Sequence, residues 1–112
     1  MSNQPPPNES LAELASVLGE DNVRTLVRTF LRDFPHSLRE MGNSDRQNQH
    51  RLAHSMKSNA RLMGANDLSQ RFAEIEERLG TPIGLKVSTK EIVEISAQFE
   101  GIAAPLRSFV QT

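Results

Sequence analysis

Apolar residues recur at spacings of three and four along most of the chain, the pattern of amphipathic helices. The longest run predicts a helix that ends near Met41. Pro35 should kink this helix rather than end it, because the apolar spacing continues beyond the proline. Its apolar stripe comprises Val23, Leu26, Val27, Phe30, Leu31, Phe34, Leu38 and Met41.

Shorter helices are predicted on both sides of this run. A first helix should begin at Ser10, with Glu13 at the spacing of a capping box, and end at Gly19. Asp21 or Asn22 can cap the long helix that follows. After a turn with a cap over residues 42–45, the pattern predicts a helix over residues 46–63 and another that ends at residue 80.

The last helix should open on a second capping box, Ser88 with Glu91, and run toward Val110. Pro105 is expected either to kink this helix or to end it early. No segment alternates as a strand does. The pattern therefore predicts an all-α fold, an antiparallel four-helix bundle with a short extra N-terminal helix. We expect a disordered Pro-rich tail over residues 1–9 and the bundle domain over residues 10–112.

Composition narrows the function classes. The 112 residues suffice for one domain with its own core. Without cysteine, the chain can form neither disulfides nor zinc–thiolate sites. The net charge of −1 argues against nucleic-acid binding, for which a basic face is expected. No apolar stretch approaches the roughly 20 residues of a membrane span. We therefore expect a cytoplasmic monomer.

His54 has the most informative surroundings. On a helical wheel, Leu52, Met56, Ala60 and Met63 form an apolar stripe, and His54 falls on the opposite face, which predicts an exposed imidazole rather than a core histidine. The polar face around it comprises Gln47, His50, His54, Lys57, Ser58 and Arg61. A nucleophilic imidazole beside one positive charge suits a phosphoryl group that is carried on histidine.

Two other interpretations of these residues were open. His50 and His54 lie one turn apart, a spacing that could hold a metal ion. The sequence shows no carboxylate well placed on that face, and His36 belongs to another helix, so a metal site is not expected. Taken alone, Lys57 is better interpreted as an ordinary solvated lysine.

The run that starts at His54 resembles the histidine-containing phosphotransfer (HPt) domains of two-component phosphorelays. That family has His, any residue, an aliphatic residue, Lys, Gly, small residues and then Gly-Ala or Gly-Leu. Ser58 stands where the family most often has Gly. The resemblance extends from Leu11 to about Leu79, so the final helix is supported by its pattern alone. The matching residues are His54, Met56, Lys57, Asn59, Ala60, Gly64 and Ala65.

The resemblance implies the same bundle and a phosphorelay carrier. His54 would accept a phosphoryl group from the aspartyl phosphate of one receiver domain and pass it to another, with Lys57 as its charge partner. It also implies response-regulator receiver domains and a hybrid sensor histidine kinase as partners, with Mg²⁺ on the receiver. The sequence has no Gly-rich phosphate loop, no nucleotide-binding motif and no acidic triad for magnesium, so we expect no kinase activity and no bound cofactor or metal. His50, Ser58 and Arg61 are candidate docking residues. The alternative is an adaptor of the same fold that binds a receiver or kinase without taking phosphate, which Ser58 favours.

Overall fold

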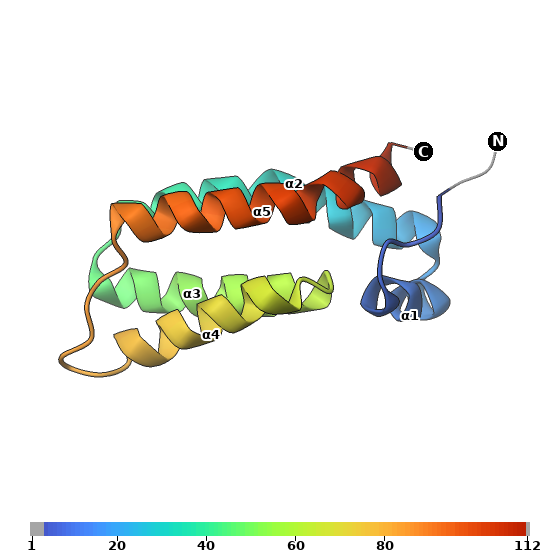
Figure 1. Cartoon of the computed structure of the whole chain (residues 1–112). Helices are drawn as coiled ribbons and strands as arrows, with labels where there is room; N and C mark the ends of the chain where they lie inside the picture. The colour runs from blue at the N-terminus through green and yellow to red at the C-terminus, as the bar shows by residue number, and fades with distance from the viewer. Residues whose placement is uncertain (1–3, 112) are drawn as a thin grey trace.

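The computed structural model describes residues 4–111, which form five α-helices and, over that range, no strand (Figure 1). The helices are α1 (Glu9–Leu18), α2 (Glu20–Gly42), α3 (Arg46–Leu62), α4 (Asn66–Leu79) and α5 (Thr89–Val110). This confirms the predicted all-α bundle with a short N-terminal helix. Residues 1–3 of the predicted tail lie outside the described residues.

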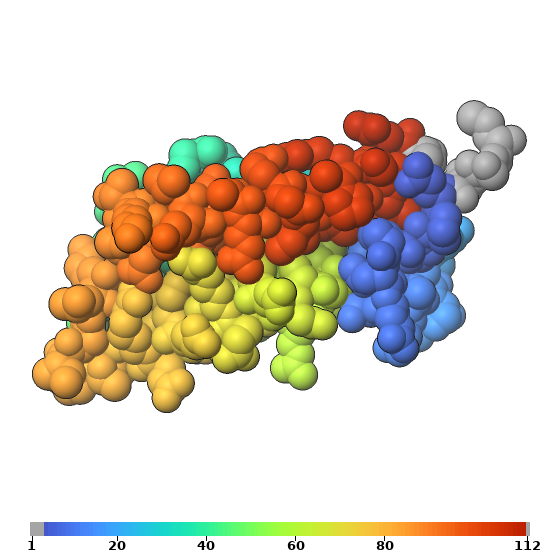
Figure 2. All heavy atoms as spheres, viewed as in Figure 1, coloured from blue at the N-terminus to red at the C-terminus, as the bar shows by residue number. Residues whose placement is uncertain are grey.

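The four longer helices form two layers. In Figure 1, α2 and α5 lie side by side in one layer and α3 and α4 form the other, while α1 packs against the start of α2 at one end. These four helices run antiparallel in chain order, as the sequence predicted (Figure 1). The space-filling view shows an elongated body with α1 closing that end (Figure 2), and the longest extent is 53 Å.

Phenylalanines from three helices meet at the centre of the core. The Phe34 ring of α2 stacks on Phe99 of α5 with 4.4 Å between ring centroids. Its other neighbours are Phe72 of α4, at 5.9 Å, and Phe30, at 5.4 Å. Burial of such large rings dominates core stability.

Pro35 lies inside α2, as predicted.

Two predicted helix starts are wrong. Asn8, not Ser10, caps α1: its Oδ1 accepts a hydrogen bond from the Leu11 N–H at 2.9 Å. Asn8 also donates to the Met63 carbonyl at 2.9 Å. This second contact explains why Asn8 rather than Ser10 is the cap, because it ties the start of α1 to the end of α3.

The cap predicted for α2 is also wrong. The helix begins at Glu20, directly after Gly19, and has no side-chain cap. Gly19 adopts φ 86°, which lets the chain turn from one helix into the next within a single residue. The Asn22 amide instead donates to the Leu18 carbonyl at 2.7 Å, and Asp21 accepts from Arg24 at 3.3 Å.

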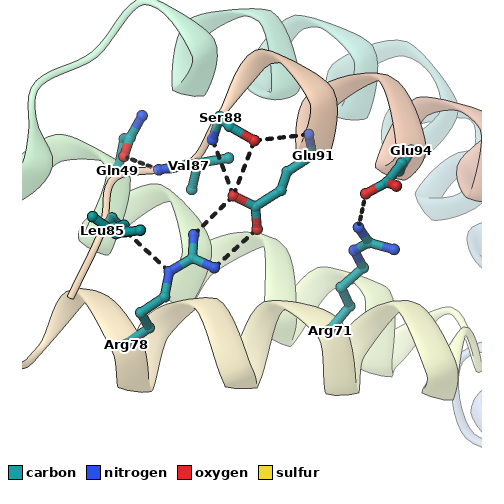
Figure 3. Close-up of polar contacts among 8 residues, drawn as sticks. All are labelled: Gln49, Arg71, Arg78, Leu85, Val87, Ser88, Glu91 and Glu94. Carbon is teal, nitrogen blue, oxygen red and sulfur yellow. Dashed lines mark hydrogen bonds and ion pairs between the residues drawn. The ribbon is translucent and has the colours of Figure 1, made fainter.

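The predicted caps at the starts of α3 and α5 are confirmed. Asp45 caps α3 by accepting from the Asn48 N–H at 2.9 Å. Ser88 and Glu91 form the predicted capping box at the start of α5 (Figure 3). Pro105 does not end α5, which continues to Val110.

Candidate functional site

His54 lies in the middle of α3 with 63% of its side chain exposed. Its helix neighbours Ala53 and Met56 are buried against the other helices. The exposed position predicted from the helical wheel is therefore confirmed. The ring lies on the side of α3 that borders α4.

A carboxylate from α4 meets the His54 ring. Glu76 Oε2 lies 2.5 Å from His54 Nδ1, and Glu76 Oε1 lies 2.6 Å from Lys57 Nζ. The expectation that no carboxylate faces His54 is therefore wrong. The antiparallel packing of α3 and α4 brings Glu76 beside His54, although 22 positions separate them in the sequence. Sequence reasoning missed this residue.

Small residues let α4 approach α3 closely. The chain turns at Gly64, which adopts φ 77°. Ser69, a buried residue of α4, then donates from its hydroxyl to the Lys57 carbonyl at 2.9 Å. This contact fixes α4 against the turn of α3 that carries Lys57. The backbone position of Glu76 is therefore set by helix packing, and its carboxylate is held by His54 and Lys57.

The protonation of Glu76 determines the state of the His54 ring. The hydrogen bond from Lys57 is the main cause that lowers the pKa of Glu76, partial burial opposes it, and the His54 hydrogen bond adds to it. An ionised carboxylate can only accept hydrogen bonds, so His54 Nδ1 must carry the proton in this contact. In a neutral ring this leaves the lone pair on Nε2 for attack.

Lys57 lies on the same side of the ring. Its side chain is 30% exposed and pairs with Glu76 at 2.6 Å, so it is not a freely solvated lysine. An ammonium group has three N–H donors. One is directed to Glu76, which leaves the others for a further acceptor beside the ring.

The three predicted docking residues lie in two places. The Ser58 hydroxyl donates to the His54 carbonyl at 3.3 Å and thus turns back on its own helix. Ser58 and Arg61 line a shallow hollow together with Leu14 and Val17 of α1. His50 lies at the other end of α3, beside Gly80.

Other features of the described residues do not add to this site. A hollow of about 140 Å³ between α2 and α3 is lined by Phe30, Phe34 and Met56 but includes neither His54 nor Lys57. Among residues 4–111, no three His, Asp or Glu side chains gather as metal ligands do.

A comparison with protein families bears on this geometry. The family model of the Hpt domain matches residues 25–104, most of the 112-residue chain. The chain belongs to the Hpt domain family. Searches among curated proteins and among solved structures found no significant match. Hpt domains carry phosphoryl groups in two-component signalling, and they interact with receiver domains and histidine kinases.

The family match also revises the extent of the resemblance. The family model begins within α2 and continues to residue 104, well into α5, whereas the resemblance of the motifs reaches only from Leu11 to about Leu79. Over residues 4–111 this Hpt domain has no helix long and apolar enough to span a membrane.

Proposed function

We propose that this Hpt domain is a phosphorelay carrier that accepts a phosphoryl group on His54 Nε2 and passes it to a second receiver domain. The observation that carries the proposal is the pairing of an exposed His54 ring with Glu76 at Nδ1, 2.5 Å away. This contact selects the tautomer in which Nε2 is the nucleophile.

The proposed transfer exchanges one bond for another. The Nε2 lone pair attacks the phosphorus of a receiver's aspartyl phosphate, an N–P bond forms, and the P–O bond to the aspartate breaks. The aspartate carboxylate is the leaving group, and the His54 Nδ1 proton stays directed at Glu76. Mg²⁺ held by the receiver would activate the phosphoryl group. Unloading to the second receiver is the reverse of these steps.

Two neighbours would stabilise the charges that develop. The imidazole becomes positive as the N–P bond forms, and the Glu76 carboxylate at Nδ1 stabilises that charge. Lys57 would pair with the equatorial phosphoryl oxygens, where positioning and charge neutralisation matter most. Because Glu76 keeps the proton on Nδ1, His54 would depart as a neutral imidazole when the phosphoryl group is passed on.

The charge of α3 suits an acidic partner. The helix has four basic side chains and no acidic ones: Arg46, Arg51, Lys57 and Arg61. Receiver domains hold Mg²⁺ with acidic residues, so their active face is complementary to this helix. We place Ser58 and Arg61 within the docking surface, together with the adjoining α1 residues Leu14 and Val17.

The test is incubation with a panel of phosphorylated receivers and Mg²⁺. A carrier takes up label as an acid-labile, alkali-stable adduct, the stability of a phosphoramidate. The rival function is an adaptor that binds receivers without taking phosphate, and Ser58 in place of glycine favours it. Tight receiver binding without any label on the chain would establish the adaptor instead.

A further inference from the structure

The loop between α4 and α5 exposes two large apolar side chains. Ile83 is 91% exposed and Leu85 is 78% exposed. We call these two residues the loop tip. Figure 1 shows the loop extending past the ends of α3 and α4, on the side away from α2 and α5.

Arg46, at the start of α3, holds the first half of this loop. Its guanidinium donates to three backbone carbonyls, those of Leu79, Thr81 and Gly84. The chain passes so close to α4 here that a Cβ on residue 84 would collide with a backbone carbonyl of that helix. The loop backbone is therefore fixed by specific contacts.

Two further side chains hold the second half. Arg78 Nε donates to the Leu85 carbonyl at 2.9 Å, and the Val87 N–H donates to Gln49 Oε1 at 3.0 Å (Figure 3). Gln49 is itself buried and donates to the Met41 carbonyl at 2.9 Å. Polar side chains of α3 and α4 thus order the loop backbone, while the apolar tip faces solvent.

The loop is basic. Between Arg78 and Glu91 the only charged residues are Lys86 and Lys90, and both are exposed. A surface that fits the tip would therefore combine an apolar hollow with an acidic rim.

The tip lies within reach of a domain docked on His54. Arg46 precedes His54 by eight residues, about 12 Å along the helix axis. Glu76 is one helical turn before Gly80, where the loop begins, and His50 also lies beside Gly80. A globular domain of roughly 100–150 residues is about 35 Å across, so one centred on His54 extends over the loop.

We propose that the loop tip is a second contact for the receiver domain that docks on His54, inserting Ile83 and Leu85 into an apolar hollow with an acidic rim. This inference rests on the proposed function. Two side chains are too small a surface for stable association alone, but they suffice to strengthen an interface that His54 has already brought together.

Calorimetric titration with receiver domains tests the contact. Each receiver is used in its Mg²⁺-bound beryllofluoride form, which mimics the aspartyl phosphate without transferring it. Ile83→Ser combined with Leu85→Ser should raise the Kd at least about tenfold, because two buried aliphatic side chains are lost. The matched control Val93→Ser, at an exposed apolar residue on α5, should change Kd less than about twofold. Methyl NMR signals of Ile83 and Leu85 should shift when the receiver is added.

The outcomes separate this inference from the carrier function. If a receiver labels His54 but binds the double variant as tightly as wild type, the loop contact is overturned and the carrier stands. If the double variant weakens binding of a receiver that never labels His54, the loop contact stands and the carrier fails. Loss of self-association or of binding to anionic lipid vesicles in the double variant, with unchanged receiver affinity, would assign the tip to another occupant and overturn the inference. If no receiver either labels the chain or binds it, both proposals fail.

Discussion

Two glutamates that lie between neighbouring helices each pair with a basic side chain, but one of them also contacts an exposed histidine. Glu76, between α3 and α4, accepts hydrogen bonds from Lys57 and His54. Glu91, between α4 and α5, accepts two from Arg78, at 2.9 and 3.1 Å. Both carboxyl groups have a lowered pKa.

The causes of the two shifts reveal the difference. Burial acts to raise the pKa of Glu91, but hydrogen bonds from Arg78 and from the Ser88 backbone outweigh it. The donors around Glu91 belong to a cap and an ion pair that join two helices, and none of them is a histidine. Glu76 instead holds a ring that is 63% exposed. Under the proposed function, a carboxylate with basic partners is thus structural between α4 and α5 and supports a reactive histidine between α3 and α4.

Replacement of the nucleophile should have the largest effect. His54→Gln should abolish uptake of label from a phosphorylated receiver and leave the helical circular dichroism spectrum unchanged, because an exposed residue contributes little to the core. His50→Gln, one turn away on the same helix, is the control and should retain most of the label. Equal label on the His54 variant would place the phosphoryl group elsewhere.

Glu76→Gln should slow transfer roughly 10- to 100-fold, because the amide cannot neutralise the developing imidazolium and no longer fixes its tautomer. Single-turnover labelling at several receiver concentrations measures the rate and separates it from binding. Glu77→Gln, at the exposed neighbour on α4, is the matched control and should behave as wild type. Equal rates for the two variants would remove Glu76 from the mechanism.

Lys57→Ala should slow transfer by about tenfold without abolishing it, because the substitution removes a charge contact to the phosphoryl oxygens but not the attacking atom. Single-turnover labelling is again the measurement, and the matched control is Arg32→Ala, at an exposed basic residue of α2. Complete loss of label in a folded Lys57 variant would contradict a supporting role.

Arg78→Ala should lower stability and leave the transfer rate at saturating receiver concentration unchanged, because the contact of Arg78 with the Leu85 carbonyl concerns receiver binding and not the chemical step. We expect the free energy of unfolding at pH 7 to fall by about 1 kcal/mol, measured by denaturant titration. The folded-state pKa of Glu91 is below its ordinary value of 4.5, so the pairing stabilises the protein above that pH and the contribution is lost as the pH falls through the folded-state pKa. The gap between wild type and variant should therefore close in acid. A slowed transfer would mean that the contacts of Glu91 also serve the site.

Local features were predictable from the sequence. The exposure of His54 and the proximity of Lys57 depend on one helix and its period, and the apolar stripe of α3 fixes both. The starts of α3 and α5 depend on Asp45 and Ser88, each a local capping signal. These predictions required no knowledge of how the helices pack.

Features that depend on packing were not predictable. Glu76 meets His54 only because α3 and α4 pack in one register, which neither helix encodes alone. The available signal was the position of Glu76 between Ile75 and Leu79, at the edge of an apolar stripe, where a half-buried carboxylate needs a partner. The choice of Asn8 over Ser10 as a cap likewise depends on a contact with another helix.

The central claim is that Nε2 of His54 carries the phosphoryl group while Nδ1 is held by Glu76. Nitrogen-15 NMR of the labelled histidine, before and after transfer from a phosphorylated receiver, measures it most directly. We expect a protonated Nδ1 in the unloaded protein and a ¹⁵N–³¹P coupling at Nε2 in the loaded protein. Coupling at Nδ1, or a chain that binds receivers and never shows a coupled nitrogen, would contradict it.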